Sequence, residues 1–77
     1  MRTWSSTGSD GAHYYVEVTG HEVIVGHHYG SGHSDCAGAA SHAEFLAGRF
    51  HDLVRERHGA GALAEVIAAV AAVARGE

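Results

Sequence analysis

Lysine, proline, asparagine and glutamine do not occur in this 77-residue chain, and cysteine occurs only once. A single cysteine cannot form an internal disulfide, so that kind of covalent cross-link is excluded. A domain of this length buries only about 60–65% of the surface that its unfolded chain exposes, which leaves it marginally stable. We expect one domain spanning residues 1–77, with self-association or a bound metal supplementing its core.

Long apolar runs are also missing. The richest stretch covers residues 63–74, about 12 positions, whereas a helix that spans a bilayer needs roughly 20. Residues 1–6 are followed by threonine, glycine, serine and aspartate, which is unlike a signal peptide. We therefore expect a cytoplasmic protein with no membrane partner.

Positive charge is scarce: five arginines face nine acidic residues, and the formal net charge is -4. Non-specific nucleic-acid binding needs a cationic surface that displaces counterions from phosphates. We therefore do not expect nucleic acid as a partner, and a DNA-binding regulator using Arg49, Arg55 and Arg57 is only the second alternative function. The bias toward alanine and glycine is typical of a high-GC genome, such as that of an actinobacterium or one of its phages.

Two segments in the N-terminal half have the composition of β-strands. Residues 12–18 and 21–29 are rich in β-branched and aromatic types, and only Thr19-Gly20 separates them, which predicts a β-hairpin. A loop centred on Thr19-Gly20 pairs Val16 with Val23. The valines then share one face of the hairpin, because side chains alternate along a strand.

Trp4 belongs to a third candidate strand within residues 3–7, which precedes a turn cluster. With a two-residue turn, Trp4 joins Tyr15 and Ile24 on the face opposite the valines and makes an exposed apolar patch. With a three- or five-residue loop, Trp4 instead opposes Val16 in the core. We take Trp4, Tyr15 and Ile24 as the candidate partner-binding residues.

The C-terminal half has helical periodicity. Ser41 and Glu44 match a capping box that starts a helix over residues 41–58, and a second helix is expected over 62–75. Residues 30–40 resemble a flexible linker rich in Gly, Ser and His. The sequence thus predicts an α+β fold, in which an antiparallel hairpin or three-stranded meander packs against two antiparallel helices.

Alanine covers nearly every side of the second helix that is not occupied by its larger apolar residues. A helix that is apolar all round is expected to be covered on more than one side, and a short chain has little material to do so. We therefore predict self-association, as a homodimer or higher oligomer, through Ala64, Ala68, Ala71 and Ala72. In the alternative interpretation the helix is monomeric, because exposed alanine is harmless and favours helix.

Eight histidines make the chain histidine-rich, and several gather within residues 27–42. Imidazole and thiolate are ligands that Zn²⁺ accepts, so His28, His33, Cys36 and His42 form the candidate metal set of the first alternative function, a zinc-type module. The spacing matches no standard zinc finger. In the alternative interpretation, which we favour, these are polar turn and surface residues in a chain that uses histidine often.

Motifs for catalysis are weak. His51-Asp52 and the segment 33–36 contain the residue types of nucleophilic catalysis, but adjacency in sequence does not make a triad. No glycine-rich phosphate-binding motif occurs. We expect a non-catalytic protein with no cofactor: a small interaction or regulatory protein that self-associates and binds another protein.

Overall fold

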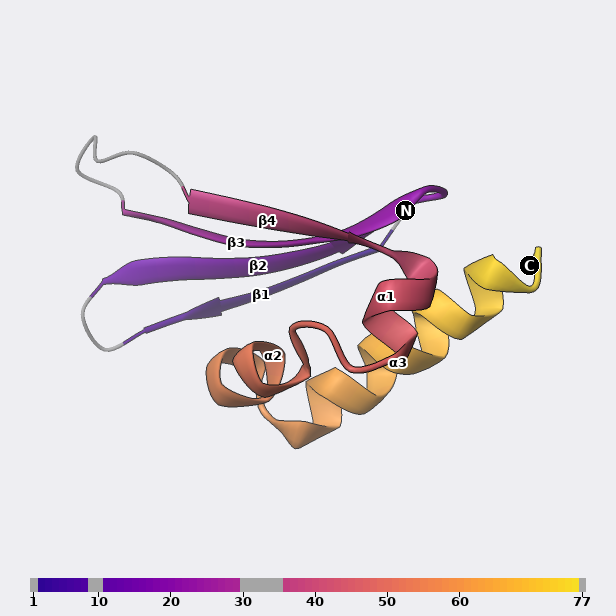
Figure 1. Ribbon diagram of the computed structural model, residues 1–77. Coiled ribbons are helices and arrows are strands. Elements are labelled where there is room, and N and C mark those ends of the chain that lie inside the picture. Colours follow the sequence, from indigo (N-terminus) through magenta and orange to yellow (C-terminus); the bar gives the residue numbers. More distant parts are fainter. Residues whose placement is uncertain (1, 9–10, 30–35, 77) are drawn as a thin grey trace.

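The computed structural model describes residues 2–8, 11–29 and 36–76 of the chain. Within these residues the strands β1 to β4 form one antiparallel sheet in sequence order, and helices α1 to α3 all lie on one face of it (Figure 1). The predicted α+β class is confirmed. The elements are β1 (Arg2–Thr7), β2 (Ala12–Val18), β3 (Glu22–Tyr29), β4 (Cys36–Ser41), α1 (His42–Leu46), α2 (His51–His58) and α3 (Ala60–Ala74).

The valines of β2 and β3 explain why the helices lie on one side. Alternate residues of a strand point to opposite faces, so the valines of both strands share the face that the helices cover, here called the inner face. Each buried apolar side chain of this size contributes about 1.5–3 kcal/mol relative to an exposed one. The core consists of Val16, Val18, Val23, Val25, Phe45, Val54, Leu63, Val66 and Val70.

The hairpin has the predicted faces but a different register. Val16 lies opposite Val25 instead of Val23, so the pairing is shifted by two residues. The Thr19 hydroxyl explains the shift, because it accepts hydrogen bonds from the backbone N–H groups of His21 (3.2 Å) and Glu22 (3.0 Å). The turn is therefore built on Gly20-His21. A shift by two leaves every side chain on its face.

Trp4 lies on the inner face, opposite Val16. The backbone N–H of Gly8 donates to the Ala12 carbonyl at 2.8 Å, so three residues form the β1–β2 loop. This loop length corresponds to the second of the two predicted arrangements, and Trp4 is partly buried against the core. The guanidinium of Arg2 lies 4.6 Å from the centre of its ring.

The segment predicted as a linker over residues 30–40 ends in a strand. β4 pairs with β3 from Glu22 opposite Ser41 to His27 opposite Cys36, so the linker prediction is wrong for its second half. The small residues of β4 have weak strand propensity, and pairing with β3 overrides it. They also allow close approach, since a Cβ added at Gly38 would lie only 3.1 Å from the Phe50 ring.

The single helix predicted over residues 41–58 is interrupted. The capping box at its start is confirmed: the Glu44 N–H donates to Ser41 Oγ at 3.1 Å, and the Ser41 N–H donates to Glu44 Oε1 at 2.9 Å. These bonds from Ser41 hold the pKa of Glu44 below its ordinary value. The first helix ends at Leu46, and Gly48, with a φ of 122°, has a backbone conformation that cannot continue it. Phe50, with a left-handed φ of 67°, precedes α2 and packs its ring against the core.

α2 and α3 meet at Gly59, whose φ of 96° suits glycine and separates the two helices by one residue. α2 lies beneath one end of the sheet, and α3 runs back past α1 until its C-terminal end projects beyond the strands (Figure 1). Among the described residues, no helix combines the length and the apolar character needed to cross a bilayer.

We expect Gly38→Val to lower the free energy of unfolding by about 1–3 kcal/mol, because its methyl groups would overlap the Phe50 ring. The matched control is Ala39→Val, on the exposed face of the same strand, where no loss is expected. Urea unfolding of both variants measures the difference. Equal effects would show that Phe50 does not pack tightly over β4.

Candidate functional site

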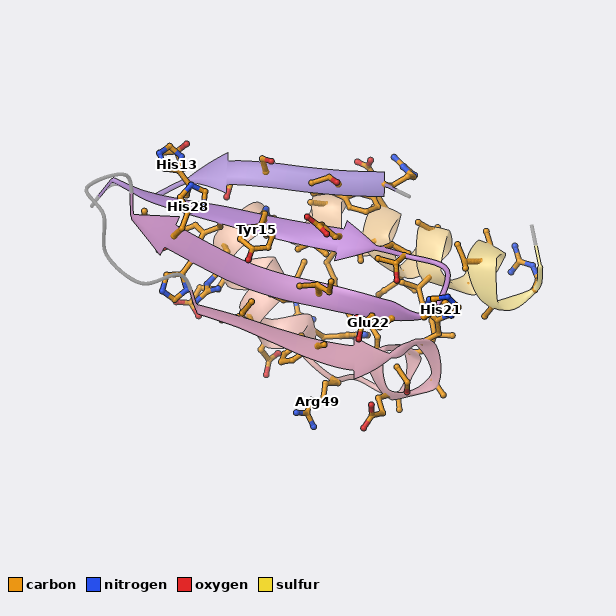
Figure 2. All side chains as sticks on the ribbon, turned by 90° about the horizontal axis from the view of Figure 1, so that it is seen from above. His13, Tyr15, His21, Glu22, His28 and Arg49 are labelled. Carbon is orange, nitrogen blue, oxygen red and sulfur yellow. The ribbon has the colours of Figure 1, made fainter. Side chains whose placement is uncertain are left out.

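The sheet face turned away from the helices, here called the outer face, is covered by none of the described elements. Figure 2 looks directly onto it. Alternation along each strand and the observed register place the following residues there: Thr3, Ser5, Thr7, His13, Tyr15, Glu17, Glu22, Ile24, Gly26, His28, Ala37, Ala39 and Ser41.

The centre of the outer face is apolar. Tyr15 and Ile24 are half-buried there, on neighbouring strands. The residues beside them are small: Gly26 lies opposite both Tyr15 and Ala37, and Ile24 lies opposite Ala39. Tyr15 and Ile24 are therefore the two larger side chains in an area of small residues over β2, β3 and β4.

One end of the outer face carries two imidazoles. His13 of β2 and His28 of β3 are directly opposite, with ring centres 5.1 Å apart and nearly parallel planes. The Tyr15 ring lies 6.3 Å from that of His28 and connects this end to the apolar centre. In Figure 2 the two histidines lie together at the end of the sheet remote from Glu22.

Glu22 lies at the other end of the outer face, opposite Ser41, and Glu17 lies nearer the centre, opposite Ile24. Both are half-buried, and neither forms an ion pair with a described residue. His21 lies in the turn at the same end and is exposed. His28 and Glu22 are six residues apart on β3, which places the two ends about 20 Å from each other.

Two of the three predicted partner-binding residues lie together on this face. Tyr15 and Ile24 are half-buried at its centre. Trp4 is on the inner face, so its inclusion in the patch is wrong, and the three-residue β1–β2 loop is the reason. His13 was not predicted as a site residue. Only the register of β2 and β3, which places His13 opposite His28, brings it into the site.

The predicted self-association residues on α3 differ in exposure. Ala64 and Ala68 are exposed, whereas Ala71 and Ala72 are half-buried. Ala72 lines a groove of about 470 Å³ between α3 and the β2–β3 turn. The other lining residues are Arg2, Val18, Thr19, Gly20, Ala69 and Val73.

The candidate metal set does not form one site. His42 Nε2 donates to the Thr19 carbonyl at 2.8 Å, which fixes His42 beside the β2–β3 turn. His28 lies near the opposite end of β3, about 20 Å away along the strand, so the two cannot share an ion. His33 and the Cys36 side chain lie outside the described part of the structure. Within that part, no three His, Cys, Asp or Glu side chains are grouped to hold a metal ion.

Other histidines support the fold. His51 Nε2 donates to the Phe45 carbonyl at 2.6 Å and its ring packs on Phe45, which closes the turn between α1 and α2. This turn separates α1 from α2, so Glu44 of α1 does not share a helix face with His51 and His58 of α2. The His27 ring lies 6.1 Å from that of Tyr14, edge to face.

His58 is the histidine whose environment most clearly disfavours charge. Its Nε2 is buried without a hydrogen-bond partner. Burial, and secondarily the nearby Arg57 guanidinium, hold the pKa of His58 below its ordinary value. The lowered pKa favours the neutral form of this imidazole at the end of α2.

The arginines are dispersed and engaged in different contacts. Arg2 lies 3.8 Å from Glu65, and Arg55 pairs with Asp52 at 2.9 Å. The Arg57 guanidinium lies over the Tyr14 ring at 4.7 Å, and that of Arg49 over Phe50 at 5.2 Å. The three arginines of the DNA-binding alternative thus make three separate local contacts.

Comparison with known proteins gives no relative for this site. No protein-family model, no curated protein and no solved structure matches the chain.

We expect the stability difference between wild type and His58→Leu to depend on pH. Because the pKa of His58 is lowered in the folded state, the neutral imidazole contributes stability above about pH 6.5. That contribution is lost as the pH falls through the lowered pKa. Acidification should therefore favour the variant. Urea unfolding at several pH values between neutral and mildly acidic measures the difference, and a constant difference would contradict the assignment.

Proposed function

We propose that this chain is a small, non-catalytic interaction protein that self-associates. The observation that carries the proposal is the outer face, an entire sheet face with Tyr15 and Ile24 at its centre and no described element over it. Antiparallel sheets can have one solvated face, but such faces are usually polar throughout. An apolar centre with a polar periphery is the arrangement of protein interfaces.

The short length of the chain supports self-association. The helices bury one sheet face and leave no further segment among the described residues to cover the other. A domain of this size gains stability when a second molecule removes apolar surface from water.

The hydrogen bonds of the histidines support a non-catalytic role. His42 and His51 each donate from Nε2 to a backbone carbonyl, and these hydrogen bonds hold the adjacent turns. Ser6 is likewise committed, because its hydroxyl donates to the Arg57 carbonyl at 2.7 Å.

Two surfaces are available for association, and one substitution on each separates them. Ile24→Arg places a charge in the centre of the outer face, and Ala68→Arg places one on the exposed side of α3. We expect wild type to form dimers or larger oligomers as its concentration rises, and at least one of the two variants to associate more weakly. Size-exclusion chromatography with light scattering measures the assembly.

Ala60→Arg is the matched control, at an exposed position at the start of α3, and should associate like wild type. A wild-type protein that stays monomeric up to millimolar concentration would contradict the proposed self-association.

A further inference from the structure

The outer face carries hydrogen-bond donors at one end and a carboxylate at the other. His13 and His28 stand together at one end, and Glu22 lies at the opposite end (Figure 2). An imidazole has an N–H group that donates to a carboxylate, and a carboxylate only accepts. Tyr15 lies between the two ends, and so does Ile24, which has Glu17 directly opposite.

This distribution is complementary to itself. Consider two copies stacked with their outer faces together, related by a two-fold axis that lies between the sheets and runs perpendicular to the strands. Such an axis reverses the strand direction, so the histidine end of each copy lies over the glutamate end of the other. The same residues then make both contacts, as an isologous interface requires.

The apolar centre fits the same arrangement. Reversing the strands places the Tyr15 row of one copy near the Ile24 row of the other, and the small residues Gly26, Ala37 and Ala39 leave room for both. Packed sheets lie about 10 Å apart, a spacing that interdigitating side chains of this length fill. An axis parallel to the strands would instead place histidine on histidine and glutamate on glutamate.

We propose that the outer face is the interface of a homodimer, in which two sheets pack face to face with antiparallel strands. The histidine end of one copy then lies over the Glu22 end of the other, with His28 over Glu22, and Glu17 lies over the Tyr15 row. This inference rests on the proposed self-association and specifies its surface and orientation. The face measures about 20 Å by 20 Å, from four strands of roughly six residues. Two such faces bury about 800 Å² together, which is less than stable interfaces bury and is in the range of weak, transient ones. A weak, reversible dimer is therefore expected.

Charge exchange tests the orientation. One variant carries Glu17→Arg and Glu22→Arg, and the other carries His13→Glu and His28→Glu. Alone, the arginine variant lacks the carboxylates that accept from the histidines, and the glutamate variant places carboxylate against carboxylate. We expect the association constant of each to fall about tenfold or more. An equimolar mixture pairs arginine with glutamate at one end and histidine with glutamate at the other, so heterodimers should form with at least wild-type affinity. Native mass spectrometry distinguishes homodimers from heterodimers by mass.

The matched control carries Glu56→Arg and Glu65→Arg, which change the net charge equally on the helical side of the molecule, where both residues are exposed. This variant should dimerise like wild type. Circular dichroism checks that each variant is folded. If a double variant does not fold, the single exchanges Glu22→Arg and His28→Glu are used in its place.

The outcomes separate the inference from the proposed function. Weakened variants whose mixture recovers affinity support the antiparallel dimer. Oligomers that form equally well in all variants, or a mixture that does not recover, overturn the inference and leave self-association standing. If only the control with Glu56→Arg and Glu65→Arg fails to dimerise, the interface lies on α3, and this outcome also overturns the inference. A wild-type protein that is monomeric at every concentration overturns both.

Discussion

The alternation of side chains along β2 and β3 determines the arrangement of the whole molecule. Val16, Val18, Val23 and Val25 share one face of the sheet, and that face is the surface that an amphipathic helix can bury. Because all three helices follow β4 in the chain and bury against the same valines, the opposite sheet face receives no cover. The candidate site is therefore a direct consequence of how the core is built.

Close packing beneath β4 depends on small residues and on one unusual backbone conformation. After α1 ends at Leu46, Phe50 adopts a left-handed φ at the start of α2, and its ring lies beside Gly38. The resulting turn is held by His51, whose imidazole donates to the Phe45 carbonyl. A continuous helix over the same residues would not bring Phe50 to this position, so the break is part of the core and not a defect in it.

The sequence predicted which faces the hairpin residues occupy, but not their partners. The face on which a strand residue lies depends only on whether its position along the strand is odd or even. The two-residue shift that the Thr19 hydroxyl imposes therefore leaves every residue on its predicted face. Trp4 could not be placed, because its face depends on whether the β1–β2 loop has an odd or an even number of residues. β4 was missed because Cys36–Ser41 is rich in small residues, whose strand propensity is weak and whose pairing is decided by the neighbouring strand.

The site was predictable to a similar degree. Tyr15 and Ile24 were placed on a common face by alternation alone, and the structure puts both on the outer face. The pairing of His13 with His28 could be predicted only from the strand register. The candidate metal set was wrong because residues close in sequence lie far apart along an extended strand, so His28 and His42 are at opposite ends of β3. Histidine in this chain serves different purposes by position: His42 and His51 hold turns, and His58 is kept neutral by burial.

Isotope-filtered NOE spectroscopy on a mixture of labelled and unlabelled protein tests most directly whether the outer face is buried by a second copy. Only contacts between molecules are detected, so the adjacency of Tyr15 and Ile24 within one chain does not interfere. We expect NOEs from the Ile24 methyl groups of one copy to the Tyr15 ring of another. Intermolecular NOEs confined to the alanines of α3, or none at concentrations where the protein is associated, would contradict the proposed interface.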